Sequence, residues 1–169
     1  SMGPKGFQFG IMPEHNSLFS IMKSNDYKTN AFYGGDFSFD AISEYLIAQD
    51  IDYMSDLYEE YKSGDDKSLG NWWGYFDHVM FGRSIEEIKK MKSPMFNLIV
   101  TITNHEALDL KDEKRQNEYL TRTDEIISKM DKEKASVYAK NKMRFSSMLY
   151  TDDCVRDFIN QYKELPNYE

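Results

Sequence analysis

The sequence predicts an α/β fold with a mainly parallel sheet flanked by helices. Two stretches have the composition of strands: residues 29–33, which end at Gly34-Gly35, and residues 96–103, which are mostly apolar or β-branched. A strand that is apolar along its whole length fits a position buried on both faces, as in parallel sheets. Elsewhere, apolar residues recur at spacings of three and four, which is typical of helices packed against a sheet.

The stretch 96–106 is expected to form the central strand and to end in the polar triplet Asn104-His105-Glu106. In open α/β sheets, ligands bind beyond the carboxyl ends of the strands, so this triplet stands where chemistry is usually placed. His105 is therefore the first candidate site residue. An alternative stays open, in which Asn104 only starts a turn and His105 caps the next segment.

Two further segments contain candidate site residues. The first strand is followed by two glycines and Asp36, which fits a loop where backbone approaches a ligand closely, or an ordinary turn with Asp36 as helix N-cap. Trp73 lies beside Gly74 and fits the core by default. His78 follows Asp77 in the first turn of a predicted helix, where a partly exposed polar role is the alternative to ligand binding.

Five helices are expected around the strands. The first is short, is capped by Asn16 or Ser17, and has Leu18, Ile21 and Met22 on its apolar face. The others are one after Asp36, one that Asp77 caps, one from about 117 to 130, and one from about 133 to 165 that Pro166 ends.

Residues 59–70 are rich in charge and glycine and are expected to form a solvated loop.

Composition bounds the class of protein. A chain of 169 residues with 40% apolar content fits one domain. Its formal net charge of -8 opposes attraction to nucleic acid, so no nucleic-acid partner is expected. Cys154 is the single cysteine, which excludes an intrachain disulfide. No apolar run approaches the ~20 residues that span a bilayer, so the segment is expected to be soluble without a membrane span. Residues 1–10 are interpreted as a cloning remnant and lead.

Several phrases, taken together and in order, resemble one family. They are residues 29–36, Trp73-Gly74 with Asp77-His78, residues 101–106, and Tyr150-Thr151-Asp152-Asp153 with Phe158. In these phrases the chain is similar to the sulfatase and phosphoglycerol transferase branch of the alkaline phosphatase superfamily, particularly the lipoteichoic acid synthase-like proteins. The resemblance implies a partial alkaline phosphatase-like fold, with residues 11–169 as the interior of a sulfatase-like domain.

The resemblance also implies roles for individual residues. In the synthases, the histidine after the corresponding strand contacts the phosphoglycerol group, so His105 is expected to bind a phosphate or sulfate oxygen. Tyr33 stands where many synthases have a histidine, so a neutral phenol replaces the imidazole. Asp36 resembles an acid that approaches the substrate's hydroxyls, although the tryptophan and arginine that follow it in the synthases are absent. The full candidate substrate-binding set is His105, Tyr33, Asp36, Asn104, Trp73 and His78.

The metal centre of the family is not matched by this sequence. Family members bind a divalent metal through acidic residues near the domain's start and an Asp-His-Gly phrase near its end, and attack with threonine, serine or formylglycine. The chain contains neither phrase, and Cys154 lacks the Pro and Arg motif of formylglycine sulfatases. We expect no catalytic or metal-binding residue in this segment, and manganese, magnesium, calcium or zinc in the intact parent.

The expected function is that of a fragment of a metal-dependent sulfatase, or of a phosphoglycerol or phosphoethanolamine transferase. The parent would act on phosphate or sulfate esters at the cell envelope, with a membrane anchor and an extracytoplasmic domain, and the segment alone would be inactive. The alternative is a noncatalytic sulfatase-like binding or structural module. A metal enzyme using His15, His78 and His105 is disfavoured, because their separations match no compact ligand motif. Missing edge strands would expose apolar surface, which predicts self-association.

Overall fold

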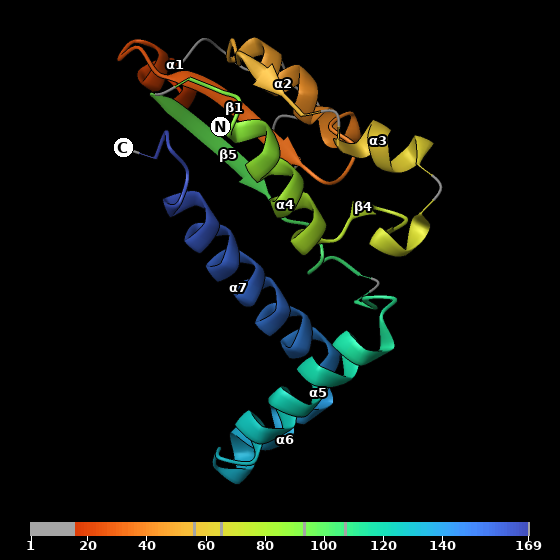
Figure 1. Ribbon diagram of the computed structural model, residues 1–169. Helices are drawn as coiled ribbons and strands as arrows, with labels where there is room; N and C mark the ends of the chain where they lie inside the picture. Colours follow the sequence, from red (N-terminus) through yellow and green to blue (C-terminus); the bar gives the residue numbers. More distant parts are fainter. Residues whose placement is uncertain (1–15, 56, 65, 93, 107, 169) are drawn as a thin grey trace, which may run out of the picture.

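A three-stranded parallel sheet with helices on both faces forms the upper part of the molecule in Figure 1. The computed structural model describes residues 16–55, 57–64, 66–92, 94–106 and 108–168. Within these residues, β1 (Lys28–Tyr33) pairs with β2 (Tyr53–Met54) on one side and with β5 (Met95–Val100) on the other. The predicted fold class is confirmed. The interpretation of residues 1–10 lies outside the described residues.

β1, and not β5, is the central strand of the described sheet. β1 is buried from Thr29 to Tyr33, whereas every residue of β5 is partly exposed. The strand order β2-β1-β5 places β5 at an edge. The expectation of a central strand over residues 96–103 is therefore wrong, because an apolar run reports that helices cover both faces but not that a strand lies on each side.

The two faces of the sheet carry separate apolar layers, because successive side chains of a strand point to opposite sides. Phe32 of β1 belongs to a cluster with residues of α3 (Leu57–Ser63), α4 (Asp77–Ile88) and α7 (Lys142–Lys163). Its neighbour Ala31 packs on the opposite side with α1 (Leu18–Lys23) and α2 (Ile42–Ala48). The helices thus hold β1 in place from above and below.

α1 begins where the sequence predicts. The Ser17 hydroxyl accepts a hydrogen bond from Ser20 N, and the Ser20 hydroxyl accepts one from Ser17 N, which completes a capping box. The predicted apolar face is wrong, since Leu18 and Ile21 are exposed and Phe19 is the buried residue. Phe19 packs edge-on against Phe96 of β5, and this contact determines which face of α1 lies against the sheet.

The polar stretch 59–70 is not simply a loop. It contains most of α3, the 3₁₀ helix η3 (Lys67–Leu69) and the start of the hairpin β3 (Gly70–Asn71) and β4 (Gly74–Tyr75). α3 buries only Leu57 and Tyr61, which lie one helical turn apart. Two buried positions in seven residues are too few for the pattern to stand out from the charges.

The last third of the chain forms a helical arm that extends away from the sheet (Figure 1). The arm comprises α5 (Glu113–Ile127), α6 (Lys132–Lys140) and the first part of α7, whose last part packs against α4. The single helix predicted over 133–165 is two helices, because the non-helical backbone of Asn141 ends α6 and begins α7. No helix in the described residues is long and apolar enough to cross a membrane.

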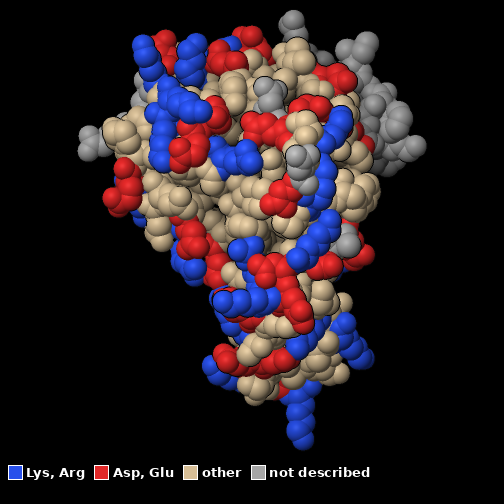
Figure 2. All heavy atoms as spheres, turned by 45° about the vertical axis from the view of Figure 1, so that its right-hand side comes forward, with Lys and Arg blue, Asp and Glu red and all other residues tan. Residues whose placement is uncertain are grey.

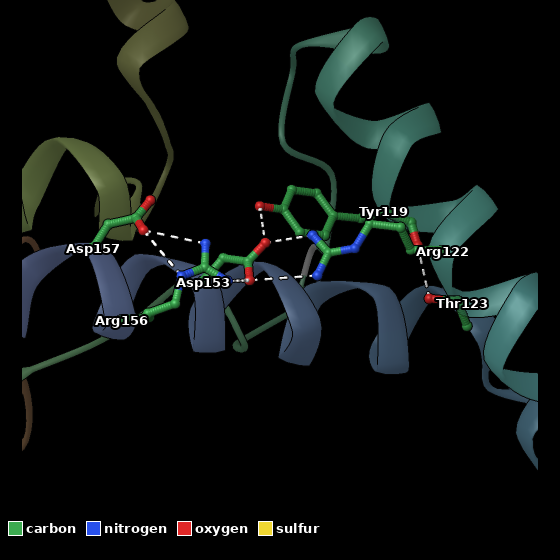
Figure 3. Close-up of polar contacts among 6 residues, drawn as sticks. All are labelled: Tyr119, Arg122, Thr123, Asp153, Arg156 and Asp157. Atoms are coloured by element: carbon green, nitrogen blue, oxygen red, sulfur yellow. Dashed lines mark hydrogen bonds and ion pairs between the residues drawn. The ribbon is translucent and has the colours of Figure 1, made fainter.

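A charged network fastens α5 to α7. Figure 3 shows Asp153 of α7 between the guanidinium groups of Arg122, on α5, and Arg156, on α7. Tyr119 Oη adds a hydrogen bond to Asp153 Oδ2 at 3.0 Å. The bond from Arg122 lowers the pKa of Asp153 below its ordinary value. Elsewhere on the face shown in Figure 2, acidic and basic side chains are interspersed, which spreads the net charge over the surface.

Candidate functional site

The candidate site lies at the carboxyl ends of β1 and β5. These strands run parallel in full register, and their last residues, Tyr33 and Val100, are opposite one another. The chain leaves β1 through Gly34-Gly35 and leaves β5 toward Asn104 and His105. Both polar loops therefore start at the same edge of the sheet, where open α/β sheets bind their ligands.

Close backbone contact joins the β1 loop to the β3–β4 hairpin. Gly35 forms an antiparallel bridge with Gly74, and Tyr75 N donates to Gly34 O at 3.0 Å. Gly74 has φ +135°, and a Cβ there would lie 2.0 Å from Gly34 O, so only glycine fits. This contact places Trp73, the residue before Gly74, beside the candidate site.

Trp73 and His105 are in direct contact. Their ring centroids lie 4.0 Å apart with an interplanar angle of 61°. Trp73 Nε1 donates to the Glu106 carbonyl oxygen at 2.6 Å, and His105 Nδ1 lies 3.0 Å from the same oxygen. A carbonyl can only accept, so Nδ1 carries the proton. In the neutral, exposed His105 ring, Nε2 is therefore the acceptor nitrogen.

Tyr33 closes the site from the β1 side. Its ring folds over Gly35, where a Cβ would lie 2.6 Å from Tyr33 Cζ and 2.8 Å from Tyr33 Oη. The side chain is 7% exposed. Burial, and then the charge of Asp36, raises the pKa of Tyr33 above its ordinary value. The phenol is therefore protonated at neutral pH and is a hydrogen-bond donor.

Asp77 holds the loop that carries His105. Its carboxylate is fully buried, and Oδ1 accepts hydrogen bonds from Ile102 N at 2.9 Å and Thr103 N at 3.1 Å. Oδ2 accepts from Thr151 Oγ1 of α7 at 2.8 Å, and Asp77 N donates to Thr103 Oγ1 at 2.9 Å. Asp77 was expected only to cap α4. It is instead the first residue of that helix and joins three segments of chain.

Comparison with known proteins supports the fold and identifies the family. A family model described as Sulfatase matches residues 2–169. The chain belongs to the sulfatase family. Comparison with curated proteins gave no match.

Two solved structures have a similar fold. One is a protein in the alkaline phosphatase superfamily from Vibrio parahaemolyticus, with 20% identity and a TM-score of 0.61, covering 89% of this chain and 32% of that one. The other is the lipoteichoic acid synthase LtaP from Listeria monocytogenes, with 19% identity and a TM-score of 0.62, covering 88% of this chain and 33% of that one. This sulfatase-family chain thus spans about a third of the length of these relatives.

The phrases that carry the sulfatase resemblance meet in space. The Gly35–Gly74 bridge joins the first to the second, and the bonds of Asp77 to Ile102 and Thr103 join the second to the third. The bond from Thr151 joins the fourth. Segments more than a hundred residues apart thus form one contiguous region around the carboxyl ends of β1 and β5.

His78 belongs to a cluster deeper between the helices. Its Nδ1 lies 2.6 Å from Tyr150 Oη, and Arg115 Nη1 lies 2.8 Å from its Nε2. Arginine can only donate, so Nε2 accepts and Nδ1 carries the proton. Burial, and then the positive charge of Arg115, lowers the pKa of His78 to about 4. The imidazole is neutral and both nitrogens have protein partners, which suits a joint between helices.

The remaining candidates, Asp36 and Asn104, lie in the two loops. Asp36 Oδ1 accepts a hydrogen bond from Ser38 N at 2.8 Å and so shapes a turn, and α2 begins only at Ile42, after the 3₁₀ helix η2 (Phe39–Ala41). Asn104 is exposed in the turn before His105. The expected substrate role of each candidate residue stays a prediction.

Two aromatic residues near the site were not singled out from the sequence. Phe39 is 48% exposed, and its ring lies 5.8 Å from that of Trp73. Trp72 is 68% exposed and stacks on Trp73 with 3.8 Å between centroids. The adjacent pair of tryptophans beside a glycine was the signal that could have pointed to them.

The donor set of the described residues does not fit a bound divalent cation. Among them, no three His, Cys, Asp or Glu side chains come together as a metal site would require. Burial raises the pKa of the Cys154 thiol to about 12, and the side chain is 7% exposed. The thiol is therefore protonated and buried, whereas a nucleophilic cysteine is a partly exposed thiolate.

Proposed function

We propose that this chain forms the substrate-side part of a sulfatase-family enzyme that acts on phosphate or sulfate esters. The observation that supports it best is that β1 ends at Tyr33 opposite the end of β5 at Val100, so the loop that carries His105 starts beside Tyr33. The ring contact between Trp73 and His105 and the hydrogen bond from Ile102 N to Asp77 hold the loop that carries His105 in place. A site held in this way is preorganised, which lowers the cost of binding a ligand.

The chemistry of the two residues suits an anionic ester. Tyr33 is a protonated phenol and donates to a phosphate or sulfate oxygen. The proton on His105 Nδ1 is engaged by the Glu106 carbonyl, so Nε2 accepts from a substrate hydroxyl while the ring is neutral. Once protonated, Nε2 donates to an anionic oxygen, and the ring's positive charge strengthens that bond.

The parent protein would be a metal-dependent sulfatase, or a phosphoglycerol or phosphoethanolamine transferase, anchored in the membrane with its catalytic domain at the cell envelope. LtaP, one of the structural neighbours, is a lipoteichoic acid synthase. A divalent metal bound by other parts of the parent would neutralise charge on the ester and activate the nucleophile. On this proposal the segment alone binds the anionic ester but does not turn it over.

Methyl sulfate tests the binding, because it stays a monoanion across the working pH range. In an NMR titration with methyl sulfate, we expect the protein resonances that shift to belong mainly to the loops that carry Tyr33 and His105. His105→Ala should weaken binding about tenfold, as expected for a lost charge-assisted hydrogen bond. Tyr27→Ala, an exposed change at the other end of β1, is the control and should bind normally. Absence of binding would overturn the proposal.

A turnover assay tests the second half of the proposal. With manganese or magnesium and 4-nitrophenyl phosphate or sulfate, the purified chain should release no more nitrophenol than His105→Ala. Turnover above that of the variant would contradict the expected inactivity.

The second candidate is a noncatalytic module that keeps the sulfatase fold. The complete reading frame of the parent separates the two. An upstream acidic phrase with threonine, serine or cysteine, and a downstream Asp-His-Gly, would favour the enzyme.

A further inference from the structure

Three aromatic residues form an exposed surface beside His105, which we call the aromatic platform: Phe39, Trp72 and Trp73. Trp72 and Phe39 are 68% and 48% exposed. Both rings contact Trp73, and Trp73 contacts the His105 ring. Large apolar rings gathered in water next to a polar site mark a binding surface more often than scattered single residues do.

The rings are held in place by the backbone. Trp73 N donates to Asn71 Oδ1 at 2.9 Å and its Nε1 donates to the Glu106 carbonyl, so both ends of this residue are fixed. Phe39 is followed by Asp40 and Ala41, which have φ values of 54° and 58°. Two successive residues with a Cβ in the left-handed region are unfavourable, and such conformations gather at functional sites.

From these observations we infer that the aromatic platform binds the alcohol portion of the ester, and that this portion presents a flat apolar face. An aryl ring and the C–H face of a pyranose share that chemistry. The inference rests on the proposed function, since the anionic group would lie at His105 and Tyr33. Trp73, with its Nε1 engaged by Glu106 and its ring against Trp72 and His105, supports the surface, and Trp72 offers the widest exposed ring.

Phenyl sulfate and methyl sulfate test the inference, because they carry the same anion and differ only in the alcohol. We expect phenyl sulfate to bind about tenfold more tightly in NMR titrations. The two tryptophans of the platform are the only ones in the chain, so emission excited selectively from tryptophan reports on it alone. Phenyl sulfate should change this emission more than methyl sulfate does, because only its ring lies on Trp72.

Substitutions connect the preference to the platform. Trp72→Ala should reduce the phenyl-to-methyl affinity ratio from about tenfold to below about twofold, and Phe39→Ala should reduce it in part. Tyr27→Ala removes an exposed ring comparable with that of Phe39 at the opposite end of β1 and should keep the ratio. Glucose 6-sulfate distinguishes the two sources of a flat face: a gain over methyl sulfate indicates a sugar, and a gain with phenyl sulfate alone indicates an aryl group.

The outcomes separate this inference from the proposed function. Equal affinity for the two sulfates overturns the platform and leaves the anion site standing. If phenol binds as well as phenyl sulfate while methyl sulfate does not bind, the platform is supported and the anion site is refuted. If none of these probes binds, both are overturned.

Discussion

His78 stabilises the fold while its imidazole ring is neutral. Its pKa of about 4 lies below the ordinary value of 6.5 because the ring is buried and faces Arg115. The unfolded chain therefore takes up a proton at a higher pH than the folded chain. The stability from the neutral ring is fully present above about pH 6.5 and is lost as pH falls toward 4.

The predicted loss is about 2 kcal/mol between pH 7 and pH 4, smaller than the full shift implies because the ring is partly exposed. Urea denaturation at several pH values measures it. His78→Gln removes the titration, so its stability should fall less over this range than that of the wild type. Val137→Gln, a change at an exposed position that does not titrate, is the control and should follow the wild-type profile. Parallel profiles for His78→Gln and wild type would contradict the assignment.

Single residues also show the limit of sequence reasoning at the site. His105 follows a strand, as the composition predicts. The strand ends at Val100 rather than at residue 103, because the backbone N–H groups of Ile102 and Thr103 bond to Asp77. The role of Asp77 did not follow from composition, because an acid at a helix start fits an N-cap equally well. Its bonds to Ile102, Thr103 and Thr151 depend on segments up to 74 residues away, which local pattern does not encode.

Among the elements, the α5–α7 contact depends on Asp153. Replacement by asparagine keeps the shape but removes the charge that Arg122 and Arg156 share. We expect Asp153→Asn to lower the free energy of unfolding by about 2 kcal/mol, since the nearly buried carboxylate that pairs with both arginines is lost. Asp157→Asn, which breaks only the exposed pair with Arg156, should change it by less than about 0.5 kcal/mol. Equal losses in urea denaturation would refute a special role for Asp153.

The elements that sequence predicted well are those with a local signal. The capping box of α1 and the ends of β1 are set by neighbouring residues. The break at Asn141 and the short helix α3 carry weak local signals, because helical pattern continues on both sides of the first and few residues are buried in the second. The edge position of β5 depends on which strands lie beside it, and composition does not report that.

For the whole molecule, apolar surface remains uncovered. The outer side of β5 meets no other strand within the described sheet, and all its residues are partly exposed. Met148, Val155 and Ile159 on α7 are 51%, 40% and 42% exposed, and their spacing places them on one face of the helix. In relatives about three times as long, further chain is available to cover such surfaces. For the isolated chain in solution, a second copy is the partner that can cover these apolar surfaces.

We therefore expect self-association that grows with concentration, because burying these side chains against a second copy removes them from water. Light scattering across a concentration series measures it. Val155→Lys combined with Ile159→Lys should shift the chain toward monomer, since a lysine pair on that face opposes apolar contact, and thermal unfolding should be retained because both side chains are already exposed. Val137→Lys adds charge at an exposed position on α6 and should leave association unchanged. A wild-type chain that stays monomeric at high concentration would contradict the expected self-association through the sheet edge and the α7 face.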